Sequence, residues 1–181
     1  MPLDRQEGIG LSHSLYPTYG DIDPYWMAAC AIDTAIRNLV VVGTMPERIA
    51  LLDNFCWCSS DDPERLGQLK RAARACYDFA VTYGAPFISG KDSMFNDFKG
   101  FDEEDRPVKI SVPPTLLISS IGILEDVTQS LTLDAKMPGD SLYLLGTTRD
   151  ELGASEYYAL MGEALRGDRF IGKCVPTVEA E

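Results

Sequence analysis

The sequence predicts an α/β fold because strand-like and helix-like segments alternate over its first 124 residues. Two segments carry apolar residues at helical spacing, and short stretches rich in β-branched and aromatic residues precede, separate and follow them. The composition is that of a globular domain, with 45% hydrophobic and 24% charged residues among 181. A chain of this length forms one sizeable core, or one domain and part of another.

The first half of this pattern is a strand, a helix and a strand. Residues 8–16 read as a strand, and turn-forming residues separate them from a helix expected over 24–42. That helix has an acidic cap and a proline in its first turn, and its apolar positions repeat at helical spacing. A short apolar strand over 48–52 then ends at Asp53 and Asn54.

The second helix has the clearest signals in the chain. Asp62 is placed to cap it, Pro63 and Glu64 stand in its first turn, and Gly84 stops it. We expect its buried stripe to consist of residues three or four positions apart, namely Leu66, Leu69, Ala73, Cys76 and Ala80.

A strand over 86–89 follows this helix and leads into the sequence Gly-Lys-Asp-Ser at 90–93. The glycine is expected to form a turn that presents an ammonium, a carboxylate and a hydroxyl group within three residues. Such a trio suits an oxyanion or a metal-bound phosphate, although a solvated hairpin tip has a similar composition. Next, an acidic, mobile loop over 96–106 leads to a strand over 108–123, which the pair Pro113-Pro114 interrupts.

Polar residues follow two strands of the predicted sheet, so a ligand site is expected where those strand ends meet. In α/β sheets ligands bind beyond the strand termini, where Asp53 and residues 90–93 would converge. This interpretation requires the Asp53 carboxylate and the Lys91 ammonium to lie close together on one side of the sheet. Thr34 and Asn38 share one face of the first helix, although Asn38 also suits a simpler role, bonding carbonyls at the helix end.

The charge and cysteine content narrow the function classes. A formal net charge of −12 argues against a nucleic-acid surface, but not against an anionic substrate held by local cations and N–H groups. The sequence shows no apolar run of membrane-spanning length and no signal-peptide pattern. Of its five cysteines, Cys56 and Cys58 suggest a metal pair, but no second pair or histidine cluster accompanies them. We therefore expect a reduced, cytosolic chain without zinc.

A second domain is expected in the last third of the chain. A turn over 137–140 precedes a predicted strand over 141–145, and a short helical stretch comes later. We therefore expect a first domain, 1–128, and the incomplete start of a second domain, 129–181.

Five blocks of sequence, in this order and spacing, resemble phosphoribosylformylglycinamidine synthase, more specifically the second of its two homologous synthetase halves. The blocks are Tyr19 to Ala29, Ile36 to Val40, Leu52 to Trp57, Ser89 to Ser93 and Val112 to Leu117. The resemblance covers about residues 8–160, and the blocks together are far more specific than any one. The wider group includes aminoimidazole ribonucleotide synthetase, selenophosphate synthetase and thiamine-phosphate kinase.

The resemblance implies a two-layer α/β sandwich of the aminoimidazole ribonucleotide synthetase N-terminal type. Such domains pair through their sheets, with ATP and substrate in the cleft between neighbours. It also implies a cytoplasmic ATP-dependent C–N ligase of de novo purine biosynthesis. In that reaction ATP activates the amide oxygen of formylglycinamide ribonucleotide as a phosphate leaving group, and ammonia from glutamine displaces it. Positioning and charge neutralisation by Mg²⁺ carry this chemistry, without a protein nucleophile.

The resemblance also assigns site residues by position, without a catalytic residue among them. The nucleotide-binding positions are Asp53, Asn54, Gly90, Lys91 and Asp92. Lys91 stands where shorter relatives place a metal-binding asparagine, so its ammonium would contact phosphate directly. Ser93 matches a substrate-contacting serine, and Asn38 matches a magnesium ligand.

Two departures from the family pattern bear on these assignments. Thr34 stands where the long-chain enzymes place a glutamate four residues before the asparagine, which weakens a metal site on this helix. The only histidine, His13, does not match the family's catalytic histidine and is expected to face a neighbouring strand. The family's upstream aspartate segment and the aspartate-rich motif of its completing domain are not in this sequence, so we expect a piece of a larger enzyme.

Three functions are compatible with the resemblance. The first is part of a catalytic synthetase, whose partners are the remaining synthase domains and a glutaminase domain or subunit. The second is a non-catalytic scaffold half that holds a structural nucleotide, which Thr34 favours. The third, another ATP-dependent kinase or synthetase of the same superfamily, is disfavoured by the blocks at Asp53 and Val112. We expect the isolated chain to lack synthetase activity and to self-associate through its sheet.

Overall fold

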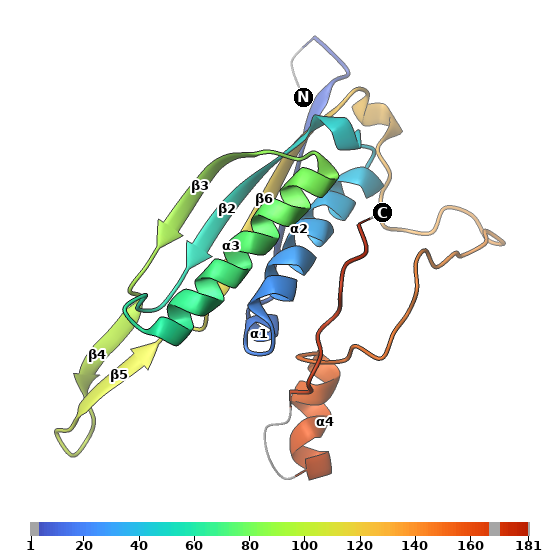
Figure 1. Cartoon of the computed structure of the whole chain (residues 1–181). Coiled ribbons are helices and arrows are strands. Elements are labelled where there is room, and N and C mark those ends of the chain that lie inside the picture. The colour runs from blue at the N-terminus through green and yellow to red at the C-terminus, as the bar shows by residue number, and fades with distance from the viewer. Residues whose placement is uncertain (1–3, 167–170, 181) are drawn as a thin grey trace.

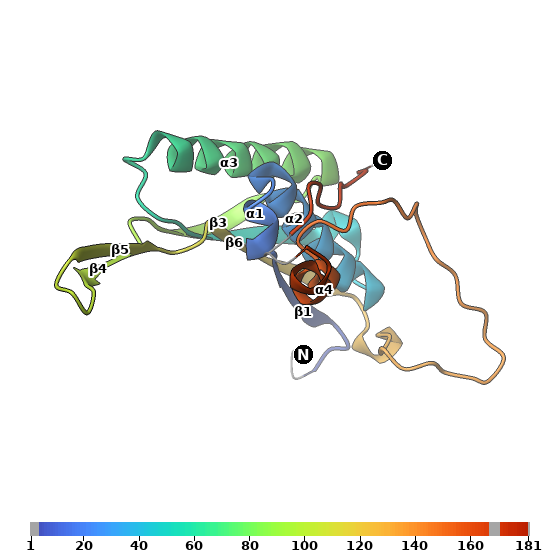
Figure 2. The ribbon, with the colours of Figure 1, turned by 90° about the horizontal axis from the view of Figure 1, so that it is seen from below.

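The structure, a computed structural model, describes residues 4–166 and 171–180. Its main body is a four-stranded mixed sheet in the order β1-β6-β2-β3, with two long helices on one face (Figures 1 and 2). The strands are β1 (Gly8–Leu15), β2 (Ile49–Cys56), β3 (Phe87–Ser93), β4 (Asp97–Phe101), β5 (Pro107–Ser111) and β6 (Thr115–Leu124). The α-helices are α1 (Pro17–Gly20), α2 (Pro24–Val41), α3 (Pro63–Tyr83) and α4 (Glu156–Arg166), and 3₁₀ turns occupy Pro46–Arg48 and Val127–Gln129.

The sheet combines antiparallel and parallel pairs. Strand β6 is antiparallel to both β1 and β2, whereas β2 and β3 are parallel and are connected by α3. A parallel pair needs such a crossover connection, and a helix usually supplies it. Both α2 and α3 lie on the same side of the sheet, so its other side is an open face within the described part of the chain (Figure 2). The predicted two-layer α/β architecture is confirmed.

The two long helices begin and end as their sequences predict. The Asp23 carboxylate accepts a hydrogen bond from the N–H of Tyr25 at 2.9 Å, and Asp62 accepts one from Glu64 at 2.9 Å. These side chains satisfy N–H groups that have no partner within the helix. At the end of α3, Gly84 has a φ of 63°, the left-handed conformation that terminates many helices.

The core lies between the two helices and the sheet, and the predicted stripe of α3 is wrong by about one position. The residues of α3 that are buried are Ala72, Ala75 and Phe79. Leu66 and Ala73 are exposed instead, while the other three predicted positions are partly buried. Small alanines let α3 approach α2 closely, so packing against the neighbouring helix decided which face turned inward.

Both strands of the predicted site are longer than the sequence suggested. Asp53 and Asn54 lie inside β2, and residues 90–93 form the second half of β3 rather than a turn. The φ angle of Gly90 is not positive, and this residue pairs directly with Asp53. Ladder hydrogen bonds between β2 and β3 keep this segment extended, which local turn propensity did not reveal.

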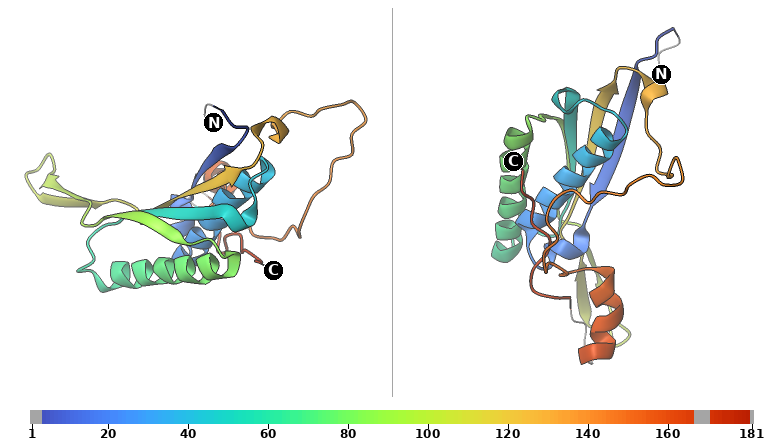
Figure 3. Two further views of the ribbon diagram at one scale, coloured as in Figure 1. Left: turned by 90° about the horizontal axis from the view of Figure 1, so that it is seen from above. Right: turned by 90° about the vertical axis from the view of Figure 1, so that its right-hand side faces the viewer.

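The predicted acidic loop over 96–106 is also wrong, because it contains a strand. Residues of β4 pair in antiparallel register with β5, from Asp97 opposite Ser111 to Phe101 opposite Pro107. This hairpin extends beyond the end of the main sheet (Figure 3). Its tip is acidic, and Asp102 there accepts hydrogen bonds from the N–H of Glu104 and Arg106. As predicted, the proline pair separates β5 from β6.

The last third of the chain has little regular structure. The turn at 137–140 is present, with the Asp140 N–H donating to the Met137 carbonyl at 3.2 Å. The predicted strand over 141–145 is wrong: this apolar segment is exposed and forms no ladder. A strand needs a neighbouring strand, and the described residues offer none here. Helix α4 forms as predicted, and residues 171–180 return to pack beside α2 (Figures 1 and 3).

Candidate functional site

The Asp53 carboxylate lies directly over Gly90 on the neighbouring parallel strand. A Cβ atom added to residue 90 would lie 2.3 Å from Asp53 Oδ1 and 2.8 Å from its Cγ. Real Cβ atoms do not approach other atoms so closely, so the glycine makes room for the carboxylate. The geometry therefore explains the glycine by a close approach of a side chain, not by a turn.

Asp53 and Asp92 lie on the helix-covered side of the sheet. Successive strand residues point to opposite faces, and Asp53 has the same parity as the buried residues Leu51 and Phe55. Asp92 pairs with Phe55 and points the same way. Partial burial raises the pKa of Asp53 above its ordinary value, and the nearby negative charge of Asp92 raises this pKa further.

Lys91 and Ser93 lie on the open face, together with Asn54 of β2. The Lys91 Nζ atom donates a hydrogen bond to Ser93 Oγ at 2.5 Å, and Asn54 is the direct cross-strand partner of Lys91. The sheet therefore separates the Asp53 carboxylate from the Lys91 ammonium. The prediction that these two groups meet on one side is wrong, because both strands continue through the motif and strand side chains alternate.

Asn96 joins the carboxyl ends of β2 and β3, and sequence reasoning missed it. Its Nδ2 atom donates to the Ser93 carbonyl at 2.7 Å and to the Trp57 carbonyl at 3.3 Å. Its backbone N–H also donates to Trp57 O at 3.0 Å, while the Trp57 N–H donates to Ser93 O at 2.8 Å. An asparagine just after a strand was the available signal, since its side chain readily bonds local backbone groups.

The face of α2 that carries Thr34 offers hydroxyl groups and an ion pair. The Thr34 hydroxyl is 2.9 Å from the Tyr16 hydroxyl. The preceding residue, Asp33, pairs with Arg37 one turn further along α2 at 2.7 Å and accepts a hydrogen bond from Tyr83 at 2.6 Å. Burial and this hydrogen bond raise the pKa of Tyr83. Asn38 is exposed.

These residues do not fit a magnesium ion. Mg²⁺ prefers carboxylate oxygens, but Thr34 supplies only a hydroxyl, and the Asp33 carboxylate is already bonded to Arg37 and Tyr83. Over the described ranges, no group of three or more histidine, cysteine or acidic side chains is placed to hold a metal. The resemblance-based role of Asn38 as a metal ligand thus remains a prediction that the surrounding side chains do not support.

The other half of the open face is apolar. On β1 the exposed side chains are Ile9, Leu11, His13 and Leu15, and the exposed fractions of Ile9 and Leu11 are 65% and 67%. His13 Nδ1 lies 2.9 Å from the Ser119 hydroxyl of β6, as expected for a histidine that faces a neighbouring strand. An exposed apolar patch on a sheet is typical of an interaction surface.

All five cysteines are free. Burial raises the pKa of Cys30 and of Cys76 to about 12, so both behave as small apolar side chains. Cys58 is buried, and Cys56 lies within 3.5 Å of the Asn96 amide nitrogen.

Among the helices in the described ranges, none is both long enough and apolar enough to cross a membrane.

The sequence of the domain that forms this sheet matches a known family. Residues 3–113 match the family described as "AIR synthase related protein, N-terminal domain". The chain belongs to this family. Its four-stranded mixed sheet packed with helices is the AIR synthase N-terminal fold.

Similar proteins extend this relationship beyond the AIR synthase domain. The chain is 33% identical over 166 residues to "Phosphoribosylformylglycinamidine synthase subunit PurL" of Methanothrix thermoacetophila, covering 87% of this chain and 20% of that protein. It is also 33% identical over 154 residues to the protein of that name from Beijerinckia indica, covering 85% of this chain and 19% of that one. The chain thus spans about one fifth of the length of these curated relatives.

Solved structures with the same fold include PurL of Thermotoga maritima. The structure titled "T. maritima PurL complexed with AMPPCP" superposes with a TM-score of 0.57 at 23% identity, covering 73% of this chain and 20% of that one. Phosphoribosylformylglycinamidine synthase II from the same organism gives a TM-score of 0.55 at 24% identity, with 74% and 20% covered. At this level of identity the likeness concerns the fold of the AIR synthase domain.

Proposed function

We propose that this chain contributes one side of a nucleotide and substrate cleft to a phosphoribosylformylglycinamidine synthase. The observation that carries the proposal is the polar group of Lys91, Ser93 and Asn54 on the open face. An ammonium, a hydroxyl and an amide within one small area are the donors that bind phosphate oxygens. The apolar half of the same face then packs against a second domain of this kind and closes the cleft.

The relatives support both the reaction class and the ligand class. The proteins that match most of the chain are named as the PurL subunit of phosphoribosylformylglycinamidine synthase. Solved structures of Thermotoga maritima PurL include complexes with AMPPCP, ADP, ATP and FGAR, and another structure from this organism is of PurLQS. By analogy, the proposed partners here are ATP, formylglycinamide ribonucleotide, the remaining synthase domains and a glutaminase, in the cytoplasm. Residues 129–181 then belong to a second domain of the synthase.

In this proposal the residues of the open face bind and orient the phosphate groups. Lys91 neutralises phosphate charge, and its contact with Ser93 holds the ammonium beside the hydroxyl that would orient the substrate. Gly90 and Asp53 act from the other side by holding the strand that carries Lys91. ATP supplies the phosphoryl group that turns the amide oxygen into a leaving group. No step is assigned to magnesium, since the α2 face does not fit it.

A second function, a scaffold half that holds a structural nucleotide, is favoured by one observation. Thr34 and Tyr16 hydroxyls occupy the α2 face where a magnesium-dependent site needs a carboxylate. A cleft that lacks a carboxylate ligand for Mg²⁺ suits a nucleotide that stays bound and is not consumed. The two functions differ in exchange: in the assembled synthase, labelled nucleotide in a scaffold cleft stays bound during turnover, whereas nucleotide in a catalytic cleft is replaced.

Calorimetric titration of the chain with ADP and ATP tests the proposal. We expect Lys91→Ala to weaken binding about 10-fold to 100-fold, since a hydrogen bond to a charged group contributes about 1.5–3 kcal/mol. Lys99→Ala, which removes an exposed lysine from β4, is the matched control and leaves binding unchanged. Equal affinities of wild type and Lys91→Ala would contradict the proposed phosphate contact. We expect no turnover by the chain alone with ATP, glutamine and formylglycinamide ribonucleotide.

A further inference from the structure

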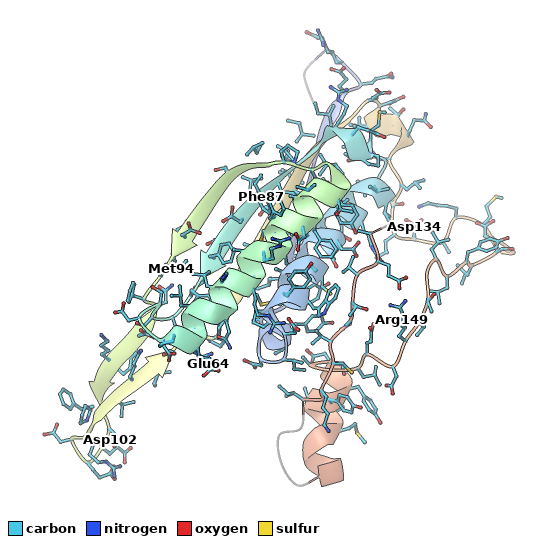
Figure 4. All side chains as sticks on the ribbon, viewed as in Figure 1. Glu64, Phe87, Met94, Asp102, Asp134 and Arg149 are labelled. Atoms are coloured by element: carbon cyan, nitrogen blue, oxygen red, sulfur yellow. The ribbon has the colours of Figure 1, made fainter. Side chains whose placement is uncertain are left out.

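The C-terminal residues 171–180, here named the strap, are tied to a loop that precedes α4. The Gly153 N–H donates to the Cys174 carbonyl at 2.8 Å, and a Cβ atom on residue 153 would lie 2.2 Å from that oxygen. Glu151 accepts two hydrogen bonds from Thr177, from the hydroxyl at 2.7 Å and from the N–H at 3.2 Å. Arg149 reaches from the same loop toward the strap, where it pairs with Glu179 (Figure 4).

The strap rests on α2 through few contacts. Val175 is its one buried side chain, with 2% of its surface exposed, and Val178 and Ala180 pack at the edge of the core. The Cys30 thiol of α2 donates to the Pro176 carbonyl at 3.2 Å, and a thiol is a weak donor. Segments with few buried apolar contacts open at low free-energy cost, before the rest of the domain unfolds.

A polar cleft of about 320 Å³ lies between the strap and the helices beneath it. Its floor is made by α1, α2 and the residue before α1, which supply Tyr16, Tyr19, Asp33, Thr34 and Arg37. Its roof is made by the strap and its loop, which supply Thr147, Glu151, Pro176, Thr177 and Val178. The roof and the floor thus come from segments more than a hundred residues apart in the sequence.

The contacts within the roof are stronger than those between the roof and the floor. Within the roof, the Glu151 carboxylate accepts two hydrogen bonds from Thr177, and Arg149 forms an ion pair with Glu179. Between roof and floor, the hydrogen bonds are Cys30 to Pro176 and Thr18 to the Ala154 carbonyl at 3.4 Å. The strap and its loop are therefore built to move as one unit relative to α2.

We propose that the strap is a lid that closes the cleft over α2 and opens without unfolding of the sheet-and-helix core. In the closed state the lid covers Cys30, whose surface is 6% exposed. In the open state Cys30 and the Thr34 face of α2 become accessible to solvent together. Glu151 stabilises the closed state, because its hydrogen bonds with Thr177 fix the strap in the conformation that packs on α2. This proposal does not depend on the ligand of the open sheet face.

Thiol labelling of the full chain tests the lid, with mass spectrometry to read alkylation at each cysteine. Cys30 reports opening of the lid, and Cys58, which is 1% exposed and lies outside the cleft lining, reports unfolding of the core. In wild type we expect rapid labelling of the exposed Cys174 and slow labelling of both buried thiols. In Thr177→Val, which removes the hydroxyl bonded to Glu151 and keeps the Glu151 charge near Cys30, we expect Cys30 to react at least 10-fold faster, with no change at Cys58.

Two further variants keep the test decisive. Glu156→Ala removes a carboxylate from the start of α4, outside the strap, and should leave Cys30 protected. Val175→Ala removes the buried apolar side chain of the strap and should accelerate labelling of Cys30 as Thr177→Val does. An unchanged Cys30 rate in both strap variants would overturn the proposal. Equal acceleration of Cys30 and Cys58 would also overturn it, because the strap would then be part of the cooperative core.

Discussion

The Asp53 carboxylate occupies the space in which a side chain at position 90 would lie. The two residues are direct partners on parallel strands, and a Cβ at 90 would approach Asp53 Oδ1 to 2.3 Å. A carboxylate on one strand therefore dictates a glycine on the next. This relationship places Lys91, the following residue, on the open face.

Replacing Gly90 by alanine should destabilise the domain by about 1–3 kcal/mol, since either the carboxylate or the strand must shift. Urea unfolding measures the change. Gly67→Ala is the matched control: residue 67 is exposed within α3 and has no neighbour near its Cβ position, so we expect stabilisation by up to about 1 kcal/mol. Adding Asp53→Ala to Gly90→Ala should recover stability, and a purely additive double variant would contradict the contact.

The raised pKa of Asp53 predicts a specific pH dependence of stability. A carboxyl whose pKa is higher in the folded state favours folding while it is protonated in the folded state, and this contribution is lost as pH rises through the folded pKa. Wild type should therefore lose stability relative to Asp53→Asn as pH rises above 3.8, the ordinary value, and the difference should become constant above the folded pKa. Unfolding curves of both proteins between pH 3 and 7 measure this difference. A difference that is independent of pH would mean that the Asp53 pKa is unshifted.

Asn96→Ala should loosen the carboxyl ends of β2 and β3. The variant removes the amide that bonds the Ser93 and Trp57 carbonyls, and each lost bond to a partly buried group costs about 0.5–1.5 kcal/mol. We expect the Trp57 N–H, which donates to Ser93 O, to exchange faster with deuterium. Asn38→Ala, at an exposed position of α2, should leave this exchange rate unchanged. Unaltered protection of Trp57 in Asn96→Ala would show that the backbone pairing suffices.

The apolar half of the open face predicts concentration-dependent self-association. Burying the exposed side chains of β1 removes apolar surface from water at about 25 cal/mol per Å². Sedimentation velocity should show wild type forming dimers as concentration rises and Leu11→Asp remaining monomeric, because a carboxylate would enter the centre of the patch. Leu160→Asp alters a leucine on α4 that is even more exposed, at 78%, and should still dimerise. Wild type that stays monomeric across the range would argue against pairing through this face.

The sequence determined the elements whose signals are local. The capping residues Asp23 and Asp62 and the terminal Gly84 located the ends of α2 and α3. These residues bond or terminate the helix backbone regardless of what packs nearby. The alternating order of helices and strands predicted the two layers, and the blocks around Asp53 and Gly90 pointed to the correct family.

Only the tertiary structure decided which residues meet. Strand pairing extended β2 and β3 through Asn54 and Ser93, and the twofold alternation of strand side chains then put Asp53 and Lys91 on opposite faces. The contact of α3 with α2 selected Ala72, Ala75 and Phe79 as its buried face, and the hairpin β4–β5 formed from residues read as a loop. These outcomes depend on partners distant in sequence, whose hydrogen bonds and packing outweigh local propensity.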